Sequence, residues 1–266
     1  MRIVALIALL FASPLMAEVV PPPGMDIYVL GEVHDNPAHH AEQARLVALI
    51  APAAVVWEML LPEQIAAMVG VDRSDAAAMA RALDWENAGW PDFAMYHPIF
   101  VAAGDVPQLA GAAPRNQVMQ VMEQGLTAVL GPAAVAEWGL GPLARDDQAA
   151  REAEQKAAHC NALPEDMLPG MVAAQRYRDW LLASVAVSAV ETSGGPVVII
   201  TGSGHARKDQ GIAALIAVAR PGLKVWSLGQ AEEDPGPDAP YDAVNITTAA
   251  PRDDPCAAFS APADGN

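Results

Sequence analysis

Short apolar runs alternate with longer alanine-rich segments along most of the chain, and this alternation restricts the possible folds more than any other feature. The runs are rich in Val and Ile and are bounded by Gly or Pro, which is typical of strands buried on both faces. We expect strands at Ile27–Leu30, Ala54–Trp57, Val106–Leu109, Val197–Thr201 and Lys224–Ser227, and a further short strand at Ala243–Thr247. Strand and helix in succession predict an α/β fold with a mainly parallel sheet and helices on both faces.

The connections between these strands are uneven in length, which bears on the domain organisation. Residues 25–230 hold the alternating pattern and are expected to form one α/β domain. Within it, residues of about 64–103 and 117–190 contain no convincing strand. We interpret these two segments as helical insertions that form a cap over one edge of the sheet. Residues 231–266 are predicted to be an acidic, Pro/Gly-rich linker and a C-terminal tail.

The first 17 residues have the order of a secretory signal peptide. Met1 and Arg2 precede an apolar run from Ile3 to Phe11, and small residues end at Ala17. The run is too short for a permanent membrane-spanning helix, and no cysteine follows it to carry a lipid. We therefore expect cleavage after residue 17 and a soluble periplasmic or secreted protein without an N-terminal lipid anchor.

The charge balance excludes two classes of partner. With 32 acidic and 15 basic side chains, the formal net charge is −17. Such a field repels nucleic acid and anionic lipid. No second apolar stretch is long enough to span a membrane. The partner expected is therefore a small molecule rather than a nucleic acid or a lipid surface.

Cys160 and Cys256 are the two cysteines of the sequence. Because exported proteins mature in an oxidising compartment, we predict a disulfide between them. Metal ligation by Cys160 beside His159 is the alternative.

Two turns share one arrangement of strand, glycine, histidine and helix. Gly31 and His34 follow the first expected strand, and Gly202 and His205 follow the fourth. Asn36 is expected to cap the helix after the first turn, with Pro37 at its first position, and a helix from about Asp209 is expected after the second. In open parallel sheets, ligands bind beyond the carboxyl ends of the strands. Both histidines are therefore expected in one site. The alternative is that each imidazole merely bonds loop backbone.

Glu58 ends a third strand and is expected at the same edge. A carboxylate near a core needs a partner. His34, Glu58 and His205 together form the set that a catalytic divalent metal, or a hydrolase that activates water directly, would use. An ion pair of Glu58 with Arg115 remains the alternative. Glu32 and Asp35 are candidate acceptors that orient the His34 ring, whereas His39 and His40 are expected to be ordinary surface or packing residues.

Two further segments could serve a porphyrin. Residues 89–100 gather aromatic and Met side chains with Tyr96 and His97, which could pack against a ring and supply an axial ligand. Hydrophobic core under a loop is the alternative. Arg176 lies in an otherwise apolar helix and could clamp a carboxylate, unless it only forms salt bridges.

The segments GEVHDNPAHH, VVWEML, GWPDFAMYHPIF, HCNALPEDMLPGMVAAQRYRDW and TGSGHARKDQGI together resemble the ChaN-like haem-binding family of the Tiki/TraB/erythromycin-esterase-like superfamily. The resemblance runs in order from about residue 25 to 230. It implies an α/β core with helical insertions and a role in haem or iron acquisition at the cell envelope. The two Gly-x-x-His motifs of the superfamily fall on Gly31 with His34 and on Gly202 with His205, and its acidic strand end falls on Glu58. Tyr96 falls in the family's aromatic segment.

The resemblance implies two functions of different classes. The leading hypothesis is an exported haem-binding protein, with Tyr96, His97, Arg115, Arg176, His34 and His205 as the candidate haem-binding residues. The other is a hydrolase in which His34, Glu58 and His205 act directly or through a divalent metal. A homodimer and an envelope transport partner are the partner hypotheses that go with haem uptake.

Overall fold

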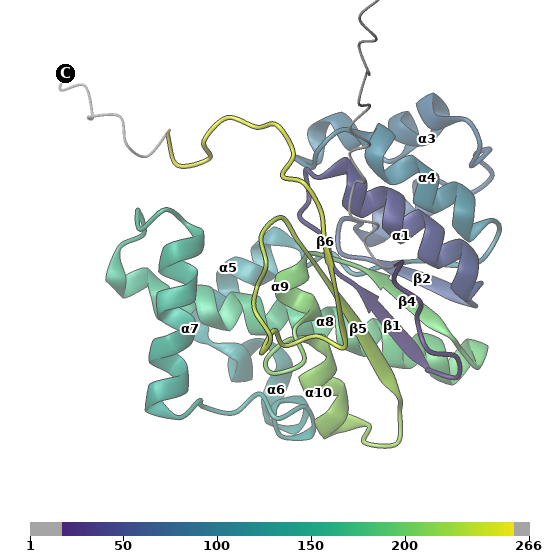
Figure 1. Ribbon diagram of the computed structural model, residues 1–266. Helices are drawn as coiled ribbons and strands as arrows, with labels where there is room; N and C mark the ends of the chain where they lie inside the picture. The colour runs from purple at the N-terminus through teal and green to yellow at the C-terminus, as the bar shows by residue number, and fades with distance from the viewer. Residues whose placement is uncertain (1–17, 258–266) are drawn as a thin grey trace, which may run out of the picture.

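The structure is a computed structural model and describes residues 18–257. The predicted signal peptide at residues 1–17 lies outside this range. In the described residues, one parallel sheet has the strand order β3-β2-β4-β1-β5-β6 (Figure 1). The strands are β1 (Ile27–Leu30), β2 (Ala54–Trp57), β3 (Gln108–Ala110), β4 (Val197–Ile200), β5 (Val225–Ala231) and β6 (Ala243–Ile246).

Alternate residues of each strand pack into two separate hydrophobic cores, because successive side chains of a strand point to opposite faces of the sheet. Ile27 and Val29 of β1 pack into one core, while Tyr28 and Leu30 pack into the other. All four residues of this strand are buried. A strand buried on both faces needs a continuous apolar sequence, which is why the short apolar runs predict the sheet so well.

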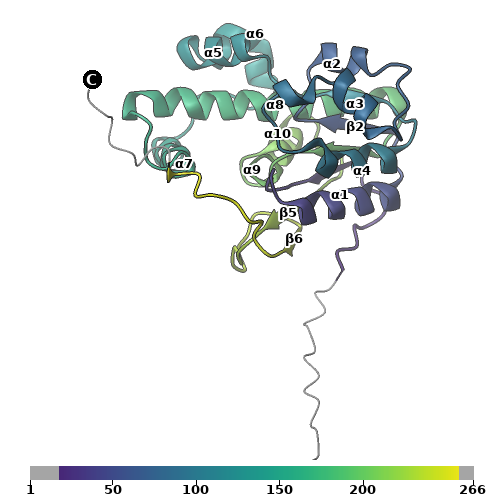
Figure 2. The same cartoon turned by 90° about the horizontal axis from the view of Figure 1, so that it is seen from above.

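Helices cover both faces of the sheet (Figures 1 and 2). The core that contains Leu30 is closed by α1 (Pro37–Ile50), α3 (Ala76–Ala82) and α4 (Phe93–Ala103), with α2 (Pro62–Ala67) and the 3-10 turn η1 (Trp85–Asn87) beside them. The core that contains Val29 is closed by α5 (Arg115–Gln124), α6 (Leu126–Glu137), α8 (Leu168–Ser193) and α10 (Ile212–Ala219).

The two expected insertions therefore supply helices that pack directly against the sheet or its first helix. From residues 64–103 comes α4, which packs along α1. From residues 117–190 comes most of α8, which contacts β2 and β4. By contrast, α7 (Arg145–Ala158) buries no side chain and extends to one side (Figure 2). The short elements η2 (Glu165–Met167) and α9 (Ser203–Ala206) complete the order.

Several boundaries differ from the sequence prediction; β5, for example, continues to Ala231 instead of ending at Ser227. The third strand begins at Gln108 rather than Val106, because Pro107 has no N–H and contributes only its carbonyl, to Val55 N. The helix expected from about Asp209 begins at Ile212 instead. Gly211, which precedes it, packs so closely on the carbonyl of His205 that a Cβ would lie 2.3 Å from that oxygen.

The C-terminal segment is joined to the domain in two ways. Its strand β6 pairs with β5 at the sheet edge, as expected for residues 243–247. Cys256 forms a disulfide with Cys160, whose Cα lies 5.4 Å away. None of the helices in residues 18–257 has the length and hydropathy needed to cross a membrane.

Candidate functional site

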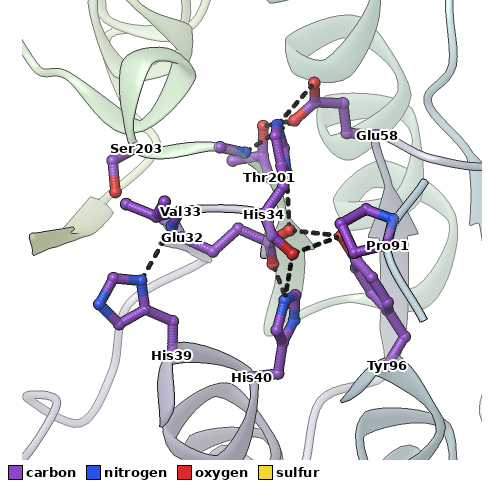
Figure 3. Close-up of polar contacts among 12 residues, drawn as sticks. Glu32, Val33, His34, His39, His40, Glu58, Pro91, Tyr96, Thr201 and Ser203 are labelled. Atoms are coloured by element: carbon purple, nitrogen blue, oxygen red, sulfur yellow. Dashed lines mark hydrogen bonds and ion pairs between the residues drawn. The ribbon is translucent and has the colours of Figure 1, made fainter. Parts of the chain in front are cut away.

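Three adjacent strands deliver the paired turns and Glu58 to one edge of the sheet. β4 lies between β1 and β2 and is parallel to both. The carboxyl ends of the three strands therefore coincide, which places His34, Glu58 and His205 next to one another (Figure 3 shows the first two). The expectation of one shared polar cluster agrees with this geometry.

The first turn is built around a buried carboxylate, Glu32. Its Oε1 atom lies 2.8 Å from His34 Nδ1 and accepts a hydrogen bond of 3.0 Å from the Tyr96 hydroxyl (Figure 3). The second oxygen, Oε2, lies 3.4 Å from His40 Nδ1, without hydrogen-bond geometry. The Glu32 side chain is 0% exposed, so it contacts these groups and not solvent. They hold the imidazole of His34 in one orientation.

A helix start fixes the chain just beyond this turn. Asn36 caps α1 by accepting from Ala38 N, and Pro37 occupies the first helical position, as the sequence predicts. Asp35 instead pairs with Arg252 of the C-terminal segment at 2.7 Å. His39 and His40, expected as ordinary residues, are both fully buried. His39 accepts a bond from Val33 N and thereby ties the turn to the helix.

Glu58 is held by the second turn. Its Oε2 atom accepts hydrogen bonds from Thr201 Oγ1 at 2.6 Å and from Gly202 N at 2.7 Å. Its Oε1 atom lies 3.4 Å from His205 Nε2 and 4.0 Å from His34 Nε2. Burial alone would raise the pKa of this carboxyl, but the charges of the two imidazoles and the bonds from His205 and Thr201 hold it well below its usual range. Arg115, the alternative partner, plays no part.

His205 lies between two carboxylates. Its Nδ1 atom is 2.6 Å from Oδ1 of Asp179 on α8, and its Nε2 atom faces Glu58. Burial disfavours the imidazolium, but the two carboxylates overcome this effect and raise the pKa of His205 to about 10. The pKa of Asp179 is raised, because its burial and the nearby charge of Glu58 outweigh the attraction of His205. His205 is therefore protonated at neutral pH.

The result is a line of alternating acids and imidazoles: Glu32, His34, Glu58, His205, Asp179. Only His34 has substantial contact with solvent: its side chain is 37% exposed, against 11% or less for the other four. Burial lowers the pKa of His34, but the bond to Glu32 and the charge of Glu58 more than compensate, so that it lies above its ordinary value. His34 is the group through which this cluster can meet a ligand.

Other residues expected at the site do not reach the exposed surface beside His34. Tyr96 is 0% exposed and its hydroxyl is engaged by Glu32, whereas His97 Nε2 contacts the carbonyl of Arg73. Arg176 is buried and donates to the carbonyls of Gly139 and Gly141. The structure thus does not bring Tyr96, His97 and Arg176 to a common surface with His34.

Arg115 lines a solvent-open hollow of about 540 Å³ near the His34 end of the cluster. Met59, the residue after Glu58, and Trp90 also line it. The Trp90 ring meets the His34 ring edge-on, with centroids 5.0 Å apart. Arg115 is exposed, and none of the described residues forms an ion pair with it. The hollow combines aromatic and apolar surface with one arginine and two acids, Glu63 and Asp84.

Asp179 and His40 are the functional residues that the sequence analysis missed. Asp179 lies in the same largely apolar helix as Arg176, and an acid on a buried helix face signals a buried partner. For a metal, the expected set is His34, Glu58 and His205. Among residues 18–257, however, no group of three or more His, Cys, Asp or Glu side chains is arranged to hold a metal ion. The cluster instead has the geometry of an ion-pair network.

Comparison with known proteins gives one family and one similar fold. A family model described as haem-binding uptake, Tiki superfamily, ChaN matches residues 23–216. The solved structure of cofacial haem binding to ChaN of Campylobacter jejuni superposes with a TM-score of 0.63 at 18% identity, covering 83% of this chain and 86% of that one. A succinoglycan biosynthesis protein gives a TM-score of 0.38 at 12% identity, covering 78% of this chain and 66% of that one. No curated protein matches the sequence.

Proposed function

The chain belongs to the ChaN family of haem-binding uptake proteins in the Tiki superfamily, and from this premise we propose that it binds haem as cargo in haem or iron acquisition. The family match covers the strands and turns that build the polar cluster. The similarity to the Campylobacter jejuni protein, whose structure concerns haem binding, supports the same proposal.

The observation that carries the proposal is the exposure and orientation of His34. An axial imidazole must offer iron an unprotonated nitrogen, while its other nitrogen is fixed by a second group. Glu32 accepts from Nδ1 of His34 and thereby leaves Nε2 as the free ligand atom. The hydrogen bond also increases the electron density on the ring, which strengthens its bond to ferric iron.

The surface beside His34 fits a porphyrin. Trp90 and Met59 offer aromatic and thioether contacts at the adjacent hollow, and such contacts favour a flat apolar ring. Arg115 lies on the same wall and can pair with a propionate. In a protein of net charge −17, and in a hollow that Glu63 and Asp84 also line, Arg115 is the cation that can offset the repulsion of a dianionic ligand.

The remaining candidates of the sequence analysis are assigned lesser roles in this proposal. Tyr96 bonds Glu32 and His205 bonds Asp179, so both side chains orient other members of the cluster and do not contact haem. His97 is held by backbone away from the cluster. His34 and Arg115 are therefore the residues we assign to direct contact with haem.

Spectroscopic titration tests this assignment. Added haem should give a saturable Soret shift with the wild-type protein, and His34→Ala should shift the band and weaken binding by about tenfold or more, because the iron–nitrogen bond is lost. Arg115→Gln should weaken binding without moving the band. His97→Ala is the matched control and should behave like the wild type. Unsaturable absorption that ignores all three substitutions would refute the proposal.

We further place this binding outside the cytoplasm, in the periplasm, with a second copy of the chain and an envelope transport protein as partners. The family's role in uptake and the secretory pattern of residues 1–17, which lie outside the described residues, support this placement. Cell fractionation and light scattering with and without haem test it. A cytoplasmic protein that stays monomeric at saturating haem would contradict it.

A second function, hydrolysis, is favoured by the position of His34 itself. An exposed imidazole oriented by one carboxylate and facing another, Glu58, has the geometry of a general base that activates water. In this role the positive charge of His205 keeps the Glu58 carboxylate ionised. Turnover of chromogenic esters that disappears in both His34→Ala and Glu58→Gln would establish this activity. Retention of haem binding by Glu58→Gln would separate the two functions.

A further inference from the structure

A second hollow lies at the Asp179 end of the cluster, the end opposite to His34, where α7, α8 and α9 meet (Figures 1 and 2 show the three helices). Its volume is about 180 Å³, below that of pockets for drug-sized ligands and suited to a smaller molecule, and it shares no lining residue with the hollow beside Trp90. Three arginines contribute to its wall, Arg151, Arg176 and Arg207, beside the amides of Gln155, Gln175 and Gln210.

Arg176 is the unusual member of this wall. It is only 9% exposed, yet no described carboxylate pairs with it. Its Nη2 atom donates to the carbonyls of Gly139 and Gly141, and the described residues provide no acceptor for its other N–H groups. A buried guanidinium without a counter-charge is costly, so proteins normally pair it. Here the unpaired donors remain available to the hollow.

A second cation increases this imbalance. Burial, and then the positive charge of Arg151, lower the pKa of Arg176 by more than the charges of Asp147 and Asp179 raise it. Among the described residues, Arg151 forms an ion pair only with Asp147, one turn earlier on α7. Two like charges held beside one hollow repel each other, and an anion between them removes that repulsion.

The acids that line the hollow do not supply this anion. Glu154 is engaged by Arg207 and by the amide of Gln210. Asp179 is engaged by His205. The hollow is lined by three arginines and two acids, so its lining carries a formal charge of +1 in a protein whose formal charge is −17.

We propose that this hollow is a second binding site, which takes the oxyanion group of a small organic molecule between Arg176 and Arg151. Planar guanidinium groups bind carboxylates and phosphates in a bidentate manner, which matches the donors left free on Arg176. Val172 and Ala158 line the remainder and fit a short apolar body. This site is independent of the proposed haem site.

Calorimetric titration of the full chain at low salt tests the proposal, with succinate as the carboxylate probe and glycerol phosphate as the phosphate probe. We expect at least one of them to bind saturably with one-to-one stoichiometry, and its affinity to fall with added salt. The probe that binds more tightly identifies the oxyanion class. If neither binds at millimolar concentration, the proposal is wrong.

Substitutions locate the binding. Arg176→Gln should weaken it by about tenfold or more, because charge-assisted bonds are lost. Arg178→Gln is the matched control, since this residue lies on the same helix but not in the wall of the hollow, and it should bind as the wild type does. Arg151→Gln, on the exposed helix α7, provides a second measurement should Arg176→Gln fail to fold. His34→Ala should keep full affinity. Equal affinity in the wild type and both hollow variants would overturn the proposal.

Discussion

Glu32 contacts three polar side chains at the exposed end of the cluster, although His34 is the residue that meets solvent. Its carboxylate, which is 0% exposed, contacts the imidazoles of His34 and His40 and the hydroxyl of Tyr96. In such surroundings a single charge has a large effect, because no solvent screens it. The properties of His34 thus depend on a side chain that no ligand touches.

Replacing Glu32 by Gln should therefore lower the pKa of His34. The amide can still accept from Nδ1, but the negative charge that favours the imidazolium is gone. Histidine resonances followed by NMR across pH measure this change. Asp35→Asn is the control, because Asp35 adjoins His34 in sequence but pairs with Arg252 at the surface, and it should leave the His34 titration nearly unchanged. An unaltered midpoint in Glu32→Gln would show that the charge is unimportant.

His205 makes stability depend on pH in the alkaline range. Its pKa is about 6.5 in the unfolded chain and is raised to about 10 in the folded one, so the folded state binds the proton more tightly. The resulting stability is complete below pH 6.5 and declines as pH rises to about 10, with a slope of up to about 1.4 kcal/mol per pH unit. Urea unfolding of the wild type and of His205→Gln should give a difference that shrinks over this range. A difference in unfolding free energy that stays constant with pH would contradict the pairing of His205 with Glu58 and Asp179.

At the scale of the elements, the site depends on two close approaches that need glycine. A Cβ on Gly31 would lie 2.7 Å from the Leu228 carbonyl and 2.9 Å from Ser203 Cα, both backbone atoms that cannot move aside. A Cβ on Gly202 would lie 3.1 Å from the His34 ring. The glycines of the paired motifs thus let the turns pack against each other, which explains their spacing from the histidines.

Gly31→Ala should consequently destabilise the fold by about 1–3 kcal/mol, the usual cost of overpacking. Gly204→Ala in the neighbouring turn is the matched control, since a Cβ there meets nothing within 4 Å. Thermal unfolding compares the two. Equal midpoints for both variants would mean that the turns do not pack as described.

The elements also show what a single sequence can predict. Strands β1 and β2 coincide with the predicted ranges because burial on both faces demands unbroken apolar runs. The insertion of β4 between them is not readable in this way, since strand order depends on contacts between residues distant in the chain. The clustering of His34, Glu58 and His205 was still predictable, because parallel strands end at one edge whatever their order. The role of Asp179 was not predictable in this way, because this residue comes from helix α8 and not from the end of a strand.

At the scale of the whole molecule, the C-terminal segment ties distant parts together. Asn36, which caps α1, also donates to Glu232, and Arg252 bonds both Glu232 and Asp35 beside the His34 turn. The disulfide of Cys256 with Cys160 then connects the same segment to the region between α7 and α8. The described part of the segment expected as a linker and tail therefore connects the His34 turn to the region between α7 and α8.

Loss of that disulfide should lower the stability of the fold. The cysteines are 96 residues apart, and closing a loop of this length stabilises a protein by up to about 4–5 kcal/mol in the chain-entropy model. Denaturant unfolding of Cys160→Ser/Cys256→Ser against the oxidised wild type measures the difference. Indistinguishable unfolding midpoints would show that the disulfide does not stabilise the fold.

The most direct test of the haem proposal is pulsed electron paramagnetic resonance on the ferric haem complex of protein labelled with ¹⁵N-histidine. If His34 supplies the axial bond, the wild type and His97→Ala should show the coupling of an imidazole nitrogen to iron, and His34→Ala should lose it. An unchanged nitrogen coupling in His34→Ala, or its loss in His97→Ala, would place the haem elsewhere and contradict the account.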